Sequence, residues 1–279
     1  MVIDFHTHTF PDRISAFAVD KLKRACHTPA YSDGKASGLR MSMRRAGVDG
    51  SVVLPVVTNP AKTEGINDVS IELNDKDGLI YFGGIHPDTE NASEELTRIA
   101  DAGIKGIKIH PVYQDVNIDD IRFLRILGKA SELGLIVVMH AGDDIAYPGK
   151  VRCAPKMIRS AVQQVGPVKL VCAHMGGWRN WECVADMLAD TSVMLDTALS
   201  LGKMESLEPG FYTDEELSMM GESTFCQLLK VFGANRILFG SDSPWSDQEA
   251  SISAIRGLPL TQEEKLAVLG GNAQKLLGL

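Results

Sequence analysis

The chain has 279 residues, of which 44% are hydrophobic, so it can bury a sizeable core in one large domain or two ordinary ones. Its 36 acidic and 28 basic residues give a formal net charge of -8, which argues against a nucleic-acid partner and favours a small-molecule partner. Because no apolar stretch approaches the roughly 20 residues that span a bilayer, we expect a cytoplasmic protein with no membrane partner, and we leave a homodimer open.

Eight short apolar runs rich in Val, Ile and Leu are predicted to form strands. They lie at 2–8, 51–57, 79–87, 103–111, 135–140, 168–174, 192–196 and 236–242. Between them, apolar residues recur at three- and four-residue spacing, which predicts amphipathic helices. These helices are expected near 39–47, 90–102, 118–132, 154–165, 180–190, 214–232 and 246–256, with one or two more in 261–279.

The alternation of apolar strands and helices predicts an α/β fold with a parallel sheet covered by helices. Eight such units in about 250 residues favour a (β/α)8 TIM barrel, formed by residues 1–279 as one domain. No G-x-G-x-x-G motif follows the first strand, so an open dinucleotide-binding sheet lacks its signature. Two long connections, 9–49 and 197–216, are expected to be surface loops or covers of the barrel mouth.

The cysteines do not indicate a disulfide framework or a zinc ribbon. Their number is odd and no C-x-x-C pair is present, so we expect reduced thiols. They are Cys26, Cys153, Cys172, Cys183 and Cys226.

Six of the seven histidines lie at the C-terminal end of a predicted strand. They are His6, His8, His86, His110, His140 and His174. In a parallel barrel these strand ends open onto the active-site face. A single histidine there is usually structural, but six at one rim indicate a common function.

His6 and His8 are one residue apart on the first strand, so their side chains project to the same side, with Asp4 one layer deeper. Two imidazoles hold zinc weakly, and a catalytic site usually has a third protein ligand and an open position. His140 and Asp242, at the ends of two other strands, are the predicted additions. Three neutral imidazoles and one carboxylate around a divalent cation leave a net charge of about +1, which stabilises bound hydroxide.

Five motifs make the sequence recognisable: "DFHTH" (4–8), "GIKIHP" (106–111), "MHAG" (139–142), "AHMGG" (173–177) and "FGSDSPW" (239–245). The chain resembles the amidohydrolase superfamily, and more closely the amidohydrolase-2 branch that holds aminocarboxymuconate semialdehyde decarboxylase and related metal-dependent hydrolases. The resemblance implies that one divalent metal, commonly zinc, binds the ligands His6, His8, His140 and Asp242. It also implies that His174 contacts water or substrate beside the metal.

Lys108 and His110 are two residues apart and should both face inward on the fourth strand. In two-metal members of the superfamily a fourth-strand lysine is carbamylated and bridges the metals, so a second metal is expected only if Lys108 is carbamylated. Otherwise Lys108 binds a substrate carboxylate or forms a buried ion pair with Asp4 or another acid. His110 is predicted to bind substrate.

Three further residues have less specific signals. Arg179 is a candidate clamp for a substrate carboxylate, because guanidinium matches carboxylate geometry, although a loop arginine is commonly just solvated. His86 either lines the barrel mouth and binds substrate or is structural. Asp196, at the end of the seventh strand, is predicted to be a loop or substrate contact rather than a metal ligand.

The predicted reaction is hydrolysis of a small polar or carboxylated substrate by metal-activated water. Asp242 would accept the proton of the water and pass it to the leaving group, while His174 would stabilise the developing oxyanion. The alternative in the same branch is non-oxidative decarboxylation of a small unsaturated carboxylic acid, or hydration of a double bond. A metabolite-binding barrel without turnover is the alternative from another class, and a phosphoesterase would usually have more metal ligands.

Overall fold

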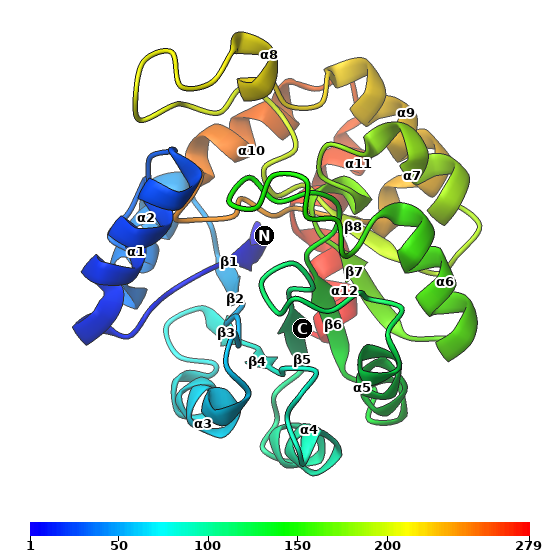
Figure 1. The fold of residues 1–279 in the computed structure, drawn as a ribbon. Coiled ribbons are helices and arrows are strands. Elements are labelled where there is room, and N and C mark those ends of the chain that lie inside the picture. The colour runs from blue at the N-terminus through cyan, green and yellow to red at the C-terminus, as the bar shows by residue number, and fades with distance from the viewer. The chain divides into compact units, whose positions relative to one another are not determined.

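The computed structural model describes residues 1–279 (Figure 1). These residues divide into two compact units. Unit 1 comprises residues 1–53 and 197–279, and unit 2 comprises residues 54–196. None of the helices has both the length and the apolar character that a bilayer crossing requires. Organisation as a single domain stays a prediction.

In unit 1, the first strand has hydrogen-bonded neighbours on both edges. β1 (Ile3–Thr7) pairs in parallel with β2 (Gly50–Val53). Its other edge bonds the segment after β9 (Ile237–Leu238): Phe5 N donates to Phe239 O at 2.7 Å, and Asp242 N donates to His6 O at 2.8 Å. The first and last strands of the chain therefore lie side by side, which is the pairing that closes a barrel.

The helices of unit 1 are α1 (Asp12–Cys26), α2 (Ala36–Ala46), α8 (Asp214–Leu217), α9 (Glu222–Phe232), α10 (Gln248–Gly257), α11 (Gln262–Leu266) and α12 (Asn272–Leu277). A 3-10 turn, η3 (Ala234–Arg236), and a π-helical turn, η4 (Ala267–Gly271), complete them. The helix predicted near 39–47 is α2, but α1 lies in a segment for which no helix was predicted. Its apolar residues Ile14, Phe17, Ala18 and Leu22 do recur at helical spacing, but Ile14 and Phe17 are exposed and the only residues that the helix buries are Ser15 and Val19.

In unit 2, five parallel strands pair in chain order: β4 (Gly83–Gly84), β5 (Gly106–Ile109), β6 (Ile136–Met139), β7 (Lys169–Cys172) and β8 (Met194–Asp196). They are buried almost throughout, which explains their continuous apolar runs. The strand predicted at 79–87 is interrupted at Phe82, so that β3 (Leu79–Tyr81) and β4 are separate.

The helices of unit 2 are α3 (Thr63–Leu73), α4 (Ala92–Asp101), α5 (Ile121–Glu132), α6 (Pro155–Val165) and α7 (Trp181–Leu188), with 3-10 turns η1 (Pro60–Lys62) and η2 (His174–Gly176). Figure 1 shows α4, α5 and α6 outside the strands of this unit. α3 was not predicted, because the residues that it buries, Thr63, Asn67 and Ser70, are polar.

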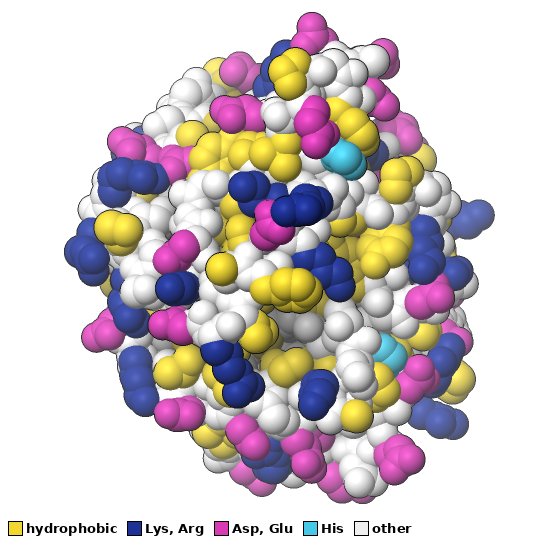
Figure 2. All heavy atoms as spheres, turned by 60° about the vertical axis from the view of Figure 1, so that its left-hand side comes forward, with side chains coloured by type: hydrophobic (Ala, Val, Ile, Leu, Met, Phe, Trp, Pro, Cys, Tyr) yellow, Lys and Arg dark blue, Asp and Glu magenta, His cyan; other side chains and the backbone are white.

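Acidic and basic side chains are interspersed on the face shown in Figure 2, with hydrophobic side chains between them. This mixed pattern agrees with the small excess of acidic residues in the sequence.

Candidate functional site

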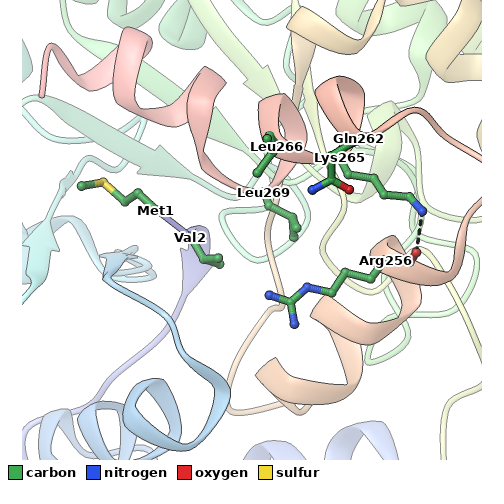
Figure 3. A pocket seen from close by; sticks show the side chains of 7 residues that line it. All are labelled: Met1, Val2, Arg256, Gln262, Lys265, Leu266 and Leu269. Atoms are coloured by element: carbon green, nitrogen blue, oxygen red, sulfur yellow. Dashed lines mark hydrogen bonds between the residues drawn. The ribbon is translucent and has the colours of Figure 1, made fainter.

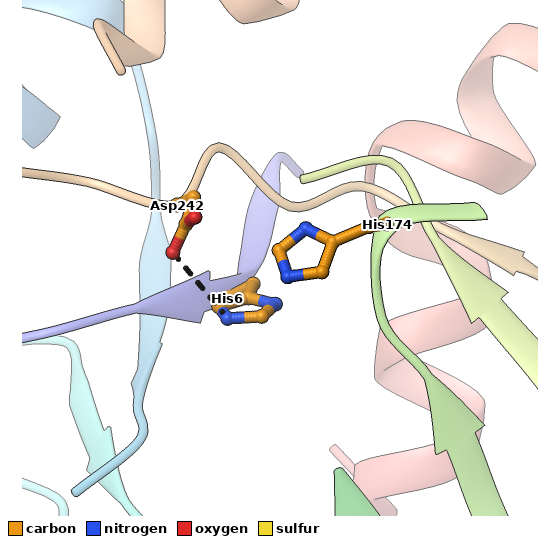
Figure 4. A group of neighbouring side chains, drawn as sticks. All are labelled: His6, His174 and Asp242. Atoms are coloured by element: carbon orange, nitrogen blue, oxygen red, sulfur yellow. Dashed lines mark ion pairs between the residues drawn. The ribbon is translucent and has the colours of Figure 1, made fainter. Parts of the chain in front are cut away.

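Two histidines of unit 1 converge on one carboxylate oxygen. His6 Nε2 lies 3.4 Å from Asp242 Oδ1, and His8 Nε2 lies 3.1 Å from the same oxygen. Figure 4 shows the His6 imidazole turned toward Asp242. The two imidazole rings are 5.1 Å apart between centroids and inclined at 70°, so each approaches Asp242 from its own direction. The side chains of His6 and His8 thus both reach the carboxylate of Asp242.

Asp242 does not continue the last strand; it lies in a turn beyond it. β9 ends at Leu238, and Asp242 has a left-handed backbone with φ of 70°. The turn is held to β1, since Asp242 N donates to His6 O and His8 N donates to Ser243 O at 2.6 Å. A non-glycine residue in this conformation costs of order 1 kcal/mol, and such strain is concentrated at functional sites.

The distances from Asp242 Oδ1 to the two imidazole nitrogens are compatible with a shared divalent cation. Around a tetrahedral zinc ion with bonds of about 2.0–2.2 Å, neighbouring ligand atoms are about 3.3–3.5 Å apart. The two nitrogen-to-oxygen distances, 3.1 and 3.4 Å, are within a few tenths of an ångström of that spacing. Two imidazoles with one carboxylate are also a donor set that catalytic zinc uses.

Unit 2 brings His140 and His174 together. His140 follows β6, His174 opens η2 after β7, and His140 Nδ1 lies 3.1 Å from His174 Nε2. His140 Nε2 is 2.9 Å from the carbonyl oxygen of Asp143, so this nitrogen carries the proton. The Nδ1 lone pair of His140 is therefore directed at His174. Nδ1 is the atom with which His140 can coordinate a metal.

His174 is anchored by its backbone. Its N–H donates to Asp196 Oδ1 at 3.0 Å, and its carbonyl oxygen accepts from Trp181 Nε1 at 2.9 Å. These bonds hold a left-handed residue, with φ of 57°. Asp196 was expected to be a loop or substrate contact; in the structure it is fully buried and holds the histidine that follows the neighbouring strand.

A second buried cluster of possible ligands is formed by His110, His140 and Asp144. His110 Nε2 lies 3.5 Å and His140 Nε2 lies 3.8 Å from Asp144 Oδ2. The His110 and His140 rings are stacked, 4.1 Å apart and inclined at only 12°. Because an imidazole nitrogen binds a metal in the plane of its ring, two parallel stacked rings cannot both coordinate one ion. We therefore interpret this cluster as a polar network that orients the two histidines.

Two residues of this network were not predicted from the sequence. Asp144 lies four residues after His140 in "HAGDD", and Gln114 lies four residues after His110 in "HPVYQ". Gln114 Oε1 accepts from His110 N at 2.9 Å, and Gln114 Nε2 donates to the carbonyl oxygens of Val57 and Ile85. The sequence signal for both was a polar residue four positions after a histidine at the end of a predicted strand, His110 or His140.

The remaining predicted substrate ligands have different surroundings. Lys108 is enclosed in β5 with 1% of its surface exposed, and it lies near the buried thiol of Cys153. His86 follows β4, and its Nδ1 accepts from the backbone N–H of Asp88 at 3.1 Å. Burial lowers the pKa of His86, so the ring is neutral near pH 7.

Arg179 lies in the loop after η2 with a left-handed φ of 63°. Its guanidinium is 4.8 Å from the centroid of the Trp178 ring, which is a cation-π contact with its chain neighbour. Three predicted site residues, Arg179, His174 and Asp242, thus share the same rare backbone conformation.

A surface depression of about 440 Å³ lies elsewhere in unit 1 (Figure 3). It is lined by Met1, Val2, Arg256, Gln262, Lys265, Leu266 and Leu269. Val2 precedes β1, so this depression lies at the start of the strand whose other end carries His8. The Lys265 ammonium donates to the Arg256 carbonyl oxygen at 2.6 Å. The depression has no histidine, cysteine or carboxylate in its lining, and its lysine is bonded to a backbone carbonyl oxygen, so it is not a candidate active site.

A short stretch of the chain resembles one curated enzyme, a D-hydantoinase from Rhizobium radiobacter. The two are 40% identical over 62 residues, which is 21% of this chain and 14% of the hydantoinase. The match therefore spans about one seventh of that relative's length.

Solved structures match the whole chain at low sequence identity. A 5-carboxyvanillate decarboxylase from Sphingomonas paucimobilis has a TM-score of 0.69 at 15% identity, with 100% of this chain and 99% of that chain covered. An uncharacterised TIM-barrel protein from Bordetella bronchiseptica has a TM-score of 0.73 at 19% identity, with coverage of 99% and 98%. A 5-carboxyvanillate decarboxylase from Novosphingobium aromaticivorans, solved with bound manganese, has a TM-score of 0.70 at 13% identity, with coverage of 100% and 97%.

These likenesses confirm the predicted TIM-barrel fold. The profile of the amidohydrolase family matches residues 3–279, which is nearly the whole chain. The five motifs that suggested this family from the sequence all lie within that range. The chain is thus a member of the amidohydrolase family, in its amidohydrolase-2 branch.

Proposed function

We propose that the protein is a metal-dependent hydrolase of a small polar or carboxylated substrate. The cation would be held by His6, His8 and Asp242 of unit 1 and by His140 of unit 2. The observation that carries the proposal is the convergence of two imidazole nitrogens on Asp242 Oδ1, at 3.4 and 3.1 Å. Membership in the amidohydrolase family supports it.

His140 is the fourth proposed ligand because of its tautomer. The Asp143 carbonyl oxygen keeps the proton on Nε2, so Nδ1 has the lone pair that a metal ligand requires. A divalent cation bound here would supply Lewis acidity, which polarises a carbonyl group and lowers the pKa of water toward 7. Zinc suits the donor set, and the manganese of one structural neighbour makes manganese the second cation to test.

Asp242 would be the proton carrier. Its carboxylate would accept the proton that the attacking water loses and return it to the leaving group. The left-handed turn holds this carboxylate against β1, so it is oriented before substrate binds. His174 would donate a hydrogen bond from Nε2 to the oxygen on which negative charge develops.

The substrate would be bound by side chains of unit 2. Lys108 and Arg179 are the cationic candidates for a substrate carboxylate, and His110 and His86 are the neutral polar ones. Arg179 offers bidentate geometry and is partly exposed, so it is the first of these to test. Lys108 is enclosed by protein and would act through its charge on groups nearby.

Decarboxylation is the second candidate, because two of the structural neighbours are decarboxylases that match the whole chain. In that reaction the bond between the substrate carbon and its carboxylate breaks, and carbon dioxide leaves without the bonding electron pair. The carbon then takes a proton, and Asp242, protonated, would supply it. The same residues would serve, so product chemistry has to distinguish the reactions.

The test begins with metal content. Protein expressed with added zinc or manganese and then dialysed should hold about one equivalent per chain by elemental analysis. A background metal content would reject the metal site, whereas two equivalents would indicate a second cation at a carbamylated Lys108.

The loaded enzyme is then screened against lactones, amides, esters and unsaturated carboxylic acids in water enriched in oxygen-18. Hydrolysis places the label in the product carboxylate and supports the first proposal. Release of carbon dioxide with uptake of solvent deuterium in heavy water would replace it with the decarboxylase. Ligand binding without turnover of any compound would overturn both reactions and favour a metabolite-binding barrel.

A further inference from the structure

The ligand-bearing segments of unit 1 are joined by one buried carboxylate, that of Asp4. Asp4 is fully buried, and each of its oxygens accepts two hydrogen bonds. Oδ1 accepts from His6 N at 3.2 Å and from Ser241 N at 2.9 Å. Oδ2 accepts from Ser241 Oγ at 2.5 Å and from Gln248 Nε2 at 2.7 Å.

These four bonds connect the segments that carry the three proposed ligands. His6 N belongs to β1, which carries the H-x-H pair, and Ser241 directly precedes Asp242. Gln248 is the first residue of α10, so this helix is tied to the same carboxylate. Ser241 Oγ also accepts from Ser243 N at 3.0 Å, so the residues on both sides of Asp242 belong to the network.

We infer that Asp4 is the positioning residue of the metal centre: it sets the distance between the H-x-H pair and Asp242. This inference rests on the proposed function, because it requires that these residues bind a cation. Asp4 does not itself reach the cation; it acts on the backbone of β1 and on the turn. Residues that orient metal ligands typically change metal affinity 10–100-fold when they are removed.

Gln248 gives the inference a specific test. Its Oε1 is buried and has no hydrogen-bond partner in the structure. In the Asp4→Asn variant, the new amide oxygen can take the place of Oδ1, and its NH₂ group would face Ser241 Oγ and Gln248. Gln248 can then rotate its amide by 180° and accept from this NH₂ group with Oε1. The conservative variant is therefore expected to keep the geometry. Asp4→Ala instead removes the acceptor of His6 N, Ser241 N and Ser241 Oγ and leaves Gln248 Nε2 only its 3.3 Å bond to Ser51 Oγ.

The experiment measures zinc affinity by competition with a chromophoric chelator, at a temperature where urea titration shows each variant to be folded. Asp4→Ala should weaken zinc binding about 10–100-fold. Asp4→Asn should retain most of the wild-type affinity, and this retention should be lost in the double variant Asp4→Asn/Gln248→Leu, which has no amide to rotate. If Asp4→Ala does not fold, Ser241→Ala tests the same link with Asp4 in place.

Asn67→Ala is the matched control, since it also removes a buried polar residue with several hydrogen bonds. Asn67 bonds Gly84 N, Gly84 O and Glu95 Oε1, and it is in unit 2 on α3. It should lower the urea midpoint and leave zinc affinity unchanged. Equal weakening by Asn67→Ala would show that lost stability is the cause, and that result would overturn the inference.

The remaining outcomes are also decisive. Asp4→Ala with wild-type zinc affinity would reject Asp4 as a positioning residue. If Asp4→Ala does not fold, wild-type zinc affinity in Ser241→Ala would reject it instead. Asp4→Asn binding as weakly as Asp4→Ala would reject the hydrogen-bond geometry on which the inference depends. If wild-type protein itself binds no zinc or manganese, the proposed function fails before this inference is tested.

Discussion

The two units arrange carboxylates and imidazoles differently. In unit 1 the Asp242 carboxylate is itself in contact with two imidazole nitrogens, at 3.1 and 3.4 Å. In unit 2 the two histidines His140 and His174 contact each other, at 3.1 Å, and the acidic residues lie behind them. The difference indicates that unit 1 presents a negative charge beside its imidazoles, whereas unit 2 presents imidazole nitrogens with a fixed proton position.

The supporting groups differ in the same way. Behind the unit 1 ligands, Asp4 bonds backbone N–H groups and a hydroxyl, so it fixes positions of the chain. Behind the unit 2 histidines, the Asp143 carbonyl oxygen and the Asp144 carboxylate lie beside ring nitrogens. A neutral donor needs its tautomer fixed, and a carboxylate ligand needs only its position fixed.

Burial also affects Asp4 directly. It raises the pKa of the Asp4 carboxyl from 3.8 to about 6, and the hydrogen bonds from Ser241 and Gln248 oppose the rise. A raised pKa means that ionised Asp4 costs folding free energy near neutral pH. The protein keeps this costly carboxylate where β1 and the turn that carries Asp242 meet, which agrees with the positioning role proposed for it.

The first prediction separates the two histidines of unit 2 and has the largest expected effect. His140→Ala should lose the metal on dialysis, and activity should fall to background. His174→Ala should keep most of the metal and lose about 10²-fold in kcat, as for a lost acid–base or electrostatic group. Elemental analysis and kcat of both variants check this, and the opposite pattern would exchange their roles.

The second prediction tests whether the unit 1 carboxylate takes part in the reaction. Asp242→Asn keeps an oxygen donor but cannot carry a proton, so it should keep a substantial part of the metal and lose about 10²-fold or more in kcat. Asp144→Asn makes the same chemical change in unit 2 and should cost less than about tenfold, because Asn keeps an oxygen at that position and Asp144 carries no proton in the proposed reaction.

The pH dependence sharpens this second test. If Asp242 is the group that ionises on the acidic limb of kcat/KM, the residual activity of Asp242→Asn should lose that limb. Near wild-type turnover in metal-loaded Asp242→Asn would exclude Asp242 as the proton carrier. Equal losses of kcat in Asp242→Asn and Asp144→Asn would show that the carboxylates of the two units do not have different roles.

The third prediction concerns the support of His174. Asp196→Ala removes the acceptor of the His174 N–H and should lower kcat about tenfold with little change in metal content. Asp196→Asn retains an oxygen acceptor at that position and should stay close to wild type. Kinetics and elemental analysis of the two variants provide the test. An unchanged kcat in Asp196→Ala would show that His174 keeps its backbone conformation without this hydrogen bond.

The strands were predictable because they are buried on both faces. Continuous runs such as "IVVM" in β6 need no partner information to be recognised. α1 and α3 were missed for the opposite reason, since α1 buries very little and α3 buries polar residues. The buried residues of α3 form no apolar stripe, whereas the apolar spacing of α1 was overlooked in a long segment that starts and ends in turn-forming residues.

The histidines of the site were predictable from their places at strand ends, whereas their hydrogen-bond partners were not. Asp4 was placed beneath the H-x-H pair by the two-residue period of the strand. Its bond to Ser241, 237 residues away in the chain, follows only from the pairing of the first and last strands. The left-handed turn at Asp242 and the tautomer of His140 likewise depend on contacts that no local pattern encodes.

The fourth prediction has the smallest expected effect and concerns the helix cap of α5, which supports unit 2 without contacting its histidines. Asp120 caps α5, the helix before the strand that leads to His140: its Oδ1 accepts from Arg122 N at 2.9 Å. Asp120→Ala should lower the free energy of unfolding by about 1 kcal/mol, as for a lost helix cap. Asp120→Asn keeps the cap acceptor and should cost a few tenths of a kcal/mol at most, since exposed ion pairs contribute little.

The pH dependence distinguishes the cap of α5 from the ion pair. The side-chain hydrogen bond from Arg122 lowers the pKa of Asp120 from 3.8 to about 2. A lowered pKa means that the charge contributes stability above pH 4 and loses it as pH falls toward 2. The difference between wild type and Asp120→Asn should therefore shrink in acid, while the difference between Asp120→Asn and Asp120→Ala should not. Urea titrations at pH 7 and at the lowest pH where all three proteins fold measure both differences.

Zinc affinity should be equal in wild type, Asp120→Asn and Asp120→Ala, because the cap supports α5 and not the orientation of His140. Weaker zinc binding in Asp120→Ala alone would show that the stability of α5 also positions the histidines of unit 2.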